Sequence, residues 1–189
     1  MLASYLDRLK SADGAFFPMN IQSPDGRVNL SLGVKGIVHF ELEARGGDWG
    51  GPEKTEIHGS YRAVVDSPAL RLVQAIASIT SADGNTTLIE GFYDDVRAPT
   101  ESEQRLINGM ARSDALDTIG DSLGVSRWID GLSGRDAITR YLYEPTLNIN
   151  GIWSGYTGPG GKTVLPEVAR AKIDSGPPLG VELERVWRL

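Results

Sequence analysis

The sequence contains no cysteine, so neither a disulfide framework nor a thiolate metal site is available to it. A chain without cysteine suits the cytoplasm, which is where we expect this protein to reside. Histidine is almost as scarce, since only His39 and His58 occur. Catalytic zinc sites usually take at least two histidines with carboxylates nearby, and neither His-Glu-x-x-His nor His-x-Asp is present. The sequence therefore predicts that this chain holds no catalytic metal by itself.

Three further features are missing or weak, and each argues against a class of protein. No run of about 18 apolar residues and no signal-peptide pattern occurs, which argues against a membrane protein. The net charge of −6 argues against nucleic acid or an anionic membrane as the main partner. The Gly-x-Ser-x-Gly pattern occurs only at residues 120–124, in a stretch typical of short helices and not of the strand-to-helix turn that a nucleophile elbow needs, and counting residues does not exclude a Ser–His–Asp triad.

What the sequence does contain is a mixed pattern of strands and helices, in a chain of 189 residues that fits about one domain. Residues 38–45 alternate between apolar and polar side chains, which predicts a strand with one face exposed to water. We expect further strands over residues 86–90, 146–150 and 164–174, on the basis of their apolar and β-branched content.

Two segments carry strong helix-start signals. Asp66-Ser67-Pro68 combines a capping side chain with a proline in the first turn, which predicts a helix from Pro68. Thr100-Glu101-Ser102-Glu103 is a capping box, and the helix after it should run to about Ala111. Residues 113–140 are typical of short helices interrupted by glycines. This order predicts an α+β fold, in which helices cover one face of an antiparallel sheet and a helical insertion interrupts the chain.

The two ends of the chain differ in character from the middle. Residues 1–11 have apolar side chains at helical spacing, and residues 23–26 are a turn signal between two extended pieces. Residues 175–180 have the composition of a linker, and residues 181–186 alternate like a final strand.

The glycine-rich stretch GYTGPGGKTVLPEV, residues 155–168, suggests a phosphate-binding loop at first sight. Such a loop needs a glycine five positions before its Gly-Lys pair, but that position holds Tyr156. A helix should also begin directly after the Lys-Thr pair, and Val164 and Pro166 disfavour one. We therefore reject nucleotide binding, and we interpret Lys162 as a solvated or ion-paired lysine.

Four stretches taken together carry a family resemblance. They are Lys35-Gly36 leading into VHFELEARG, then EIHGSYRAVVDSPA, then IEGFYDDV, and finally PTLNINGIWSGYTGPGGKTVLPEVARAKID. In order and spacing they resemble the carnosinase-like branch of the dizinc metallopeptidases. The relatives of that branch include acetylornithine deacetylase, succinyl-diaminopimelate desuccinylase and aminoacylase.

In that family a catalytic domain holds two zinc ions, and a smaller lid inserted into it forms the homodimer. The resemblance implies that this chain is such a ferredoxin-like lid and dimerisation domain, from a zinc-dependent dipeptidase or exopeptidase, and is inactive in isolation. It implies two zinc ions in the parent enzyme's catalytic domain and none here. The implied partners are a second copy of the chain, that catalytic domain, and a peptide or acyl-amino-acid substrate. The helix from Pro68 and one edge strand should then present an apolar strip.

The resemblance also assigns roles to a few residues. His58 stands where the family places the histidine that crosses the dimer and hydrogen-bonds the substrate carbonyl. Thr163 matches the threonine that helps to hold the substrate's terminal carboxylate, and Gly160 and Gly161 would let this loop approach the substrate closely. Without the resemblance, the favoured interpretation of His58 is a surface-loop histidine with no task. Residues 158–161 can be a tight hairpin between two strands, which is compatible with the substrate role.

The resemblance breaks at Gly176, where the family has an arginine that binds the substrate carboxylate. We expect residues 1–34 to be an edge of the catalytic domain and residues 35–174 to be the lid and dimerisation domain. Residues 175–189 would be a linker and terminal strand, in a natural, truncated or engineered end. Two alternatives stay open: a non-catalytic binding or assembly module that keeps the lid fold, and a self-sufficient enzyme that uses a serine triad.

Overall fold

The computed structural model describes residues 5–14, 21–22, 26, 28–29, 33–113 and 115–176. The chain divides into two compact units, residues 1–34 and residues 35–189. In the first unit, helix α1 (Leu6–Lys10) precedes the strands β1 (Ile21–Gln22) and β2 (Val28–Asn29). These two strands pair in antiparallel fashion on either side of the predicted turn, and Gly26 has the positive φ of 85° that a glycine tolerates. The predicted strand at residues 181–186 lies outside the described residues.

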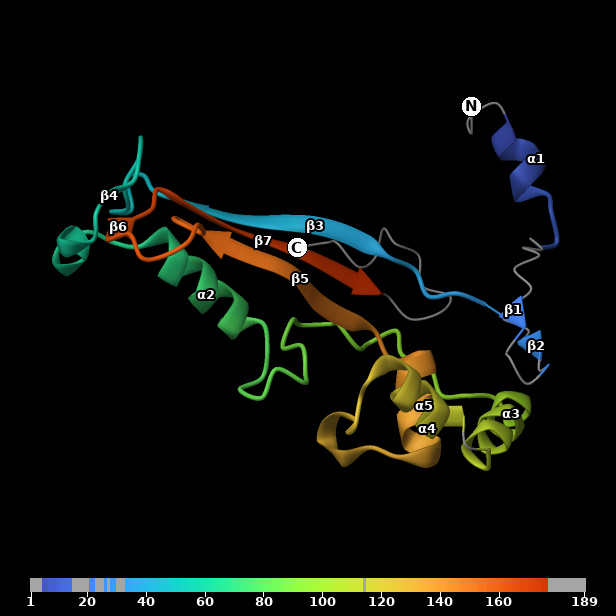
Figure 1. The fold of residues 1–189 in the computed structure, drawn as a ribbon. Coiled ribbons are helices and arrows are strands. Elements are labelled where there is room, and N and C mark those ends of the chain that lie inside the picture. Colours follow the sequence, from blue (N-terminus) through green and yellow to red (C-terminus); the bar gives the residue numbers. More distant parts are fainter. Residues whose placement is uncertain are drawn as a thin grey trace. The chain divides into compact units, whose positions relative to one another are not determined.

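The second unit is organised around an antiparallel sheet in the order β3-β7-β5 (Figure 1). Its strands are β3 (Val38–Arg45), β5 (Thr146–Ser154) and β7 (Val168–Gly176). At one end of the sheet Arg45 pairs with Val168, and at the other end Thr146 pairs with Gly176. The central strand β7 therefore joins a strand from the start of the domain to one that follows the helical segment.

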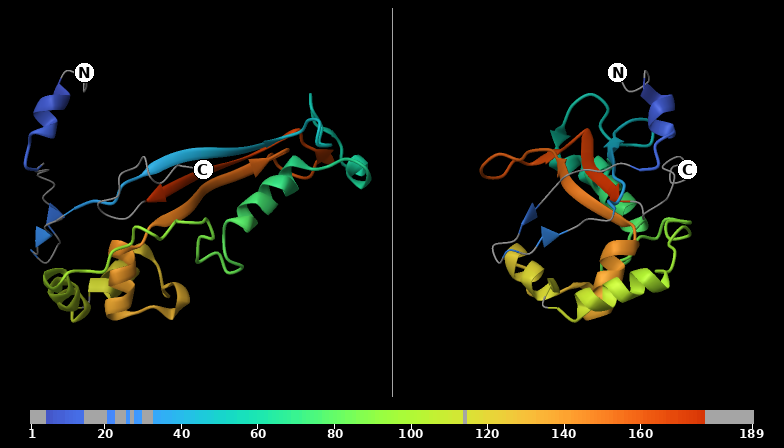
Figure 2. Two further views of the ribbon diagram at one scale, coloured as in Figure 1. Left: turned by 180° about the vertical axis from the view of Figure 1, so that it is seen from behind. Right: turned by 90° about the vertical axis from the view of Figure 1, so that its right-hand side faces the viewer.

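Helix α2 (Pro68–Ser78) covers one face of this sheet (Figures 1 and 2). It begins where the sequence predicts, because Pro68 occupies the first turn and the Ser67 hydroxyl accepts a hydrogen bond from the Leu70 N–H at 3.4 Å. Leu72 packs on the buried β7 side chains Ala169, Ala171 and Ile173, so small residues let the helix approach the strand closely. Along β3, half-buried and exposed residues alternate as predicted.

The helical insertion consists of α3 (Glu101–Ala111), α4 (Ala115–Leu123), the 3-10 turn η3 (Ile129–Gly131) and α5 (Gly134–Tyr143). The predicted capping box forms: the Thr100 side chain accepts from the Glu103 N–H, and the Glu103 carboxylate accepts from the Thr100 N–H. Ile107, Ile138 and Tyr143 form a second small core between α3 and α5. The α+β class and the antiparallel sheet are thus confirmed.

Two predicted strands differ from what the structure contains. Residues 86–90 form only a single bridge between Thr80 and Thr87, because a series of turns begins directly afterwards, with Gly91 at φ 75°. Residues 164–174 are split at Pro166, which has no N–H for a ladder, into β6 (Val164–Leu165) and β7. Strand β7 continues through Gly176. No helix within the described ranges is long and apolar enough to cross a membrane.

Candidate functional site

The sequence-predicted site residues His58 and Thr163 come from segments that meet at one end of the sheet. His58 closes strand β4 (Ile57–His58), which pairs with β6 so that His58 lies opposite Val164 and Ile57 opposite Leu165. The Gly59 N–H donates a hydrogen bond to the Thr163 carbonyl oxygen at 3.1 Å. The ladder therefore places the backbone of residues 58–59 beside residues 163–164.

The imidazole of His58 is exposed, and its local contacts favour one tautomer of the neutral ring. Its Nδ1 atom accepts a hydrogen bond from the Ser60 N–H at 3.2 Å and lies 2.8 Å from the Ser60 hydroxyl. A backbone N–H can only donate, so this geometry requires Nδ1 to be unprotonated and places the proton of the neutral ring on Nε2. The Nε2–H group is then available to donate to a ligand oxygen.

The loop between β5 and β6, residues 155–163, has a conformation that depends on glycine at two positions. Gly155 and Gly160 have φ values of 59° and 78°. A side chain at Gly158 would collide with the Tyr156 ring, whose hydroxyl donates to the Pro159 carbonyl at 2.9 Å. A Cβ atom at Gly160 or Gly161 would meet nothing within 4 Å, so this side of the loop is open. No helix follows Thr163, in agreement with the rejection of a phosphate loop.

Lys162 is ion-paired, as one of the two sequence interpretations held. Its ammonium contacts the carboxylate of Glu56, the residue directly before β4, and lies 6.0 Å from the centre of the Tyr156 ring. Sequence reasoning missed Glu56 and Ser60 as neighbours of the site. The two-residue spacing of Glu56 and His58 at a strand was the available signal that these two residues share a side, whereas Ser60 lies in a 3-10 turn (Gly59–Ala63) for which this spacing gives no signal.

Gly176, where the resemblance breaks, lies at the other end of the sheet. The nine residues of β7 span about 26 Å at the rise of an extended strand, and Thr163 lies beyond the opposite end. A Cβ atom at Gly176 would be 2.8 Å from the Thr146 hydroxyl oxygen. Residue 176 and Thr163 of the same chain are therefore too far apart to hold one carboxylate.

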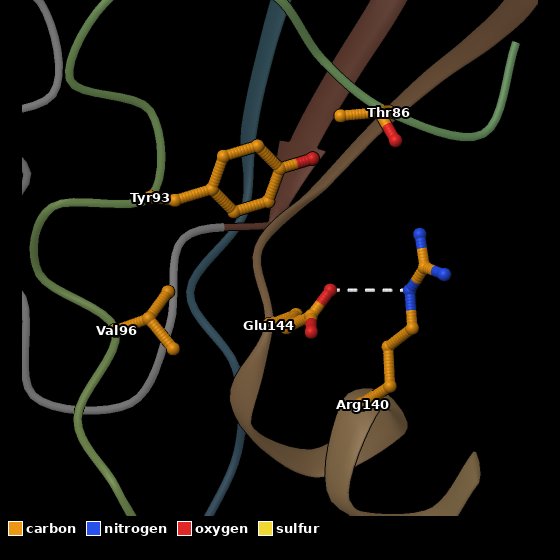
Figure 3. A pocket seen from close by; sticks show the side chains of 5 residues that line it. All are labelled: Thr86, Tyr93, Val96, Arg140 and Glu144. Carbon is orange, nitrogen blue, oxygen red and sulfur yellow. Dashed lines mark ion pairs between the residues drawn. The ribbon is translucent and has the colours of Figure 1, made fainter. Parts of the chain in front are cut away.

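A cavity of about 420 Å³ lies away from the His58 end of the sheet, lined by Thr86, Tyr93, Val96, Arg140 and Glu144 (Figure 3). The guanidinium of Arg140 already has three protein partners. It pairs with Asp130 at 2.6 Å and with Glu144 at 3.1 Å, and it donates a hydrogen bond to the Asn85 carbonyl at 2.7 Å. The hydrogen bond with Asp130 raises the pKa of Arg140. These contacts make the cavity wall a polar junction between α5 and the turns at residues 81–96.

In the described part of the chain, no three His, Cys, Asp or Glu side chains are grouped so that they could hold a metal ion. His39 lies in β3, opposite Asp174 of the sheet, whereas His58 lies in β4. The described residues therefore do not fit a zinc site.

Comparison with known proteins identifies the domain. A family model described as the M20 peptidase dimerisation domain matches residues 32–189. The chain belongs to this family. This confirms the resemblance found in the sequence, and it agrees with the α+β fold described above.

Two curated relatives of this M20 dimerisation domain are dipeptidases. The Cys-Gly metallodipeptidase dug1 of Schizosaccharomyces pombe is 26% identical over 161 residues, which are 85% of this chain and 32% of the relative. The Beta-Ala-His dipeptidase of Rattus norvegicus is 26% identical over 139 residues, which are 72% of this chain and 26% of the relative. The chain thus spans about a third or less of the relatives' length.

The fold also matches a solved structure, that of an M20 family metallo-carboxypeptidase, Sso-CP2, from Sulfolobus solfataricus. The TM-score is 0.81 and the identity 30%, with 98% of this chain and 40% of the carboxypeptidase chain covered. The M20 dimerisation domain described here is therefore similar to one part of a larger metallopeptidase.

Proposed function

We propose that this domain dimerises and covers the active site of a metal-dependent dipeptidase or exopeptidase, and that it contributes His58 to the partner subunit's active site. The observation that carries the proposal is the β4–β6 ladder, which brings His58 and the loop of Thr163 together from distant parts of the sequence. Membership of the M20 dimerisation family and the names of the relatives support the peptidase assignment.

His58 has the geometry of a hydrogen-bond donor to a developing oxyanion. Because Ser60 occupies Nδ1, the neutral ring presents Nε2–H outward from an exposed position. When a nucleophile attacks a peptide carbonyl, negative charge develops on the carbonyl oxygen, and a donor placed there stabilises the transition state more than the substrate. Ser60 is then the residue that holds the ring in the required tautomer.

The glycine-rich loop is the proposed site for the terminal carboxylate of the substrate. The Thr163 hydroxyl would donate to it, and the open side of Gly160 and Gly161 leaves room for close approach. Since β7, which ends at residue 176, is about 26 Å long and Thr163 lies beyond its other end, any group at the Gly176 end would serve a different active site from that of Thr163 in the same chain.

The catalytic metal belongs to the catalytic domain in this proposal, as two zinc ions held outside this chain. Zinc in such a site supplies an activated water molecule and polarises the carbonyl group. The contribution of the present residues is limited to orienting the substrate, holding its carboxylate and donating one hydrogen bond. The substrate class would be dipeptides or acyl amino acids with a free carboxylate.

The proposed dimer surface combines strand β5 and helix α2. In the described part of the chain β5 pairs only with β7, so its outer edge has backbone groups that can extend the sheet. Ile149 and Ile152, on the side of β5 that faces the same way as the core, are 39% and 52% exposed. Leu70 and Val73 of α2 are 48% and 50% exposed. A second copy related by a two-fold axis would cover these apolar residues.

The dimer can be tested by analytical ultracentrifugation of the purified chain. We expect a dimer for the natural sequence and a monomer for Ile152→Asp, because a carboxylate would be buried without a partner. Ile119→Asp is the matched control: Ile119 is 42% exposed but lies on α4, so this variant should remain dimeric. A monomeric natural chain at high micromolar concentration would contradict the dimer.

The catalytic role can be tested in the longer enzyme that carries this domain. Replacing His58 by Ala should lower kcat about 100- to 1000-fold with little change in KM, as expected for loss of one oxyanion donor. An unchanged turnover would refute the role of His58. One observation favours the alternative of a non-catalytic assembly module, namely the glycine at position 176; such a module would dimerise without any peptidase turnover.

A further inference from the structure

We infer that Lys162 and Glu56 act as positioning residues: their ion pair holds the glycine-rich loop against strand β4 and thereby sets His58 beside Thr163. The inference rests on the proposed function, because it concerns the residues that would contact the substrate. Neither Lys162 nor Glu56 is assigned a contact with substrate.

The contacts of Lys162 connect the loop to the strand from which His58 projects. The ammonium group pairs with the Glu56 carboxylate, and both side chains are partly exposed, at 51% and 35%. The same ammonium lies over the ring of Tyr156, and the Tyr156 hydroxyl donates to Pro159 within the loop. Lys162 therefore links the start of the loop to the neighbouring strand, and Tyr156 in turn links the start of the loop to Pro159.

The rest of the connection between loop and strand is short. Strands β4 and β6 share two residue pairs, and one more hydrogen bond joins Gly59 to Thr163. A two-stranded ladder of this length is marginal by itself, and the glycines at positions 158, 160 and 161 give the loop conformational freedom. The ion pair between Lys162 and Glu56 therefore determines the fraction of time that the loop stays in contact with strand β4.

The ion pair also lies on the same side of β4 as the histidine. Residues two apart in an extended segment project to the same face, so Glu56 and His58 share one side of the strand. Exposed ion pairs contribute little to global stability, which argues that this pair acts on the local position of the loop instead. Its loss should undock the loop while the sheet stays intact.

Hydrogen exchange of the Gly59 amide in the purified chain tests the inference, because this N–H donates directly to Thr163. Lys162→Met and Glu56→Gln should each accelerate this exchange about two- to fivefold, the range that an exposed ion pair supports. Amides of β3 and β7 should exchange as before. Lys162→Arg, and the exchanged pair Lys162→Glu with Glu56→Lys, should restore most of the protection.

Lys172→Met is the matched control, since Lys172 also lies over an aromatic ring, that of Trp153 at 5.7 Å, but at the sheet. It should leave Gly59 exchange unchanged. A second readout is the 15N spectrum of the His58 ring, in which the protonated Nε2 signal should broaden in Lys162→Met and recover in Lys162→Arg. Unchanged Gly59 protection in Lys162→Met, or equal loss in Lys172→Met, would overturn the inference.

These measurements need no enzymatic turnover, so their outcome is separate from that of the proposed function. A normal rate for His58→Ala in the longer enzyme would remove the catalytic proposal and leave the docking result standing. Normal Gly59 exchange in Lys162→Met together with an inactive His58→Ala enzyme would refute only the positioning role.

Discussion

The sheet region and the helical insertion of this domain are built on different principles. In the sheet region, residues of β3, β7 and α2 that are distant in the sequence meet over the alanines of β7. In the insertion, Ile107 of α3 packs against Ile138 and Tyr143 of α5, and only α4 and η3 lie between these two helices in the chain. The candidate site belongs to the first kind, because both its strands depend on long-range pairing. Pairing between distant segments brings the candidate functional groups together, whereas helix α3 of the insertion is stabilised by a capping box within a few residues.

Polar contacts join the two regions. Arg140 of α5 reaches the turn at Asn85, and Asn85 in turn donates to Asp130 at 2.7 Å. Lys35, just before β3, donates to the Glu144 carbonyl at 2.7 Å at the end of α5. Partial burial lowers the pKa of Lys35, and the Glu144 carboxylate opposes this shift. The two apolar cores are thus separate clusters that share a polar junction.

The largest effect is expected for Leu72→Ala in the core between α2 and the sheet. Leu72 is 2% exposed, and removing a buried leucine side chain leaves a cavity that costs about 2–5 kcal/mol. Because α2 is the helix that packs on the sheet in the described residues, we expect the sheet region to unfold at clearly lower urea concentration. Unfolding followed by far-UV circular dichroism measures the loss, and a change below about 1 kcal/mol would contradict this account of the core.

A smaller global effect but a clear local one is expected for Ile138→Ala in the insertion. Ile138 is 1% exposed, and its truncation should cost about 2–4 kcal/mol within the second core. If the regions are separable, hydrogen exchange will accelerate in α3 and α5 while β3 and β7 amides stay protected. Ile119→Ala on the exposed surface of α4 serves as the control. Equal acceleration in both regions would show that they form one cooperative unit.

Thr100→Ala should weaken the insertion by about 1 kcal/mol, the usual value of a helix N-cap. The capping box has two hydrogen bonds: the Glu103 N–H donates to the Thr100 hydroxyl at 3.4 Å, and the Thr100 N–H donates to the Glu103 carboxylate at 2.7 Å. Exchange of the first α3 amides would report the change. Thr139→Ala offers a comparison, because that hydroxyl donates to the Arg135 carbonyl within α5 and caps nothing. A larger effect at Thr139 than at Thr100 would argue against the capping box.

The smallest effect should appear on acidification. The Arg97 guanidinium, 2.7 Å from Glu103, and hydrogen bonds from Thr100 hold the pKa of Glu103 well below its usual range. A depressed carboxyl pKa stabilises the folded state above the ordinary glutamate pKa, and this contribution is lost as pH falls through the folded-state value. The melting temperature of the insertion should therefore fall in acid for the natural chain. Glu103→Gln should melt lower at neutral pH and lose less on acidification.

Local signals predicted the individual elements well. Ser67 and Pro68 marked the start of α2, Thr100 with Glu103 marked α3, and the alternation of residues 38–45 marked β3. Each of these patterns acts through hydrogen bonds or side-chain directions within a few residues. The predicted strand at residues 86–90 was wrong, because its partner offers a single bridge at Thr80 before the chain turns. Strand propensity without a long partner does not produce a ladder.

The sequence by itself determined the helix starts, the alternation of β3 and, through the four stretches of family resemblance, the domain's class. Tertiary structure alone decided that Gly59 bonds to Thr163, that Lys162 reaches Glu56, and that position 176 lies at the opposite end of the sheet. The physical reason is that strand pairing joins segments far apart in the chain. No local pattern in either strand specifies which partner its hydrogen-bonding groups will meet.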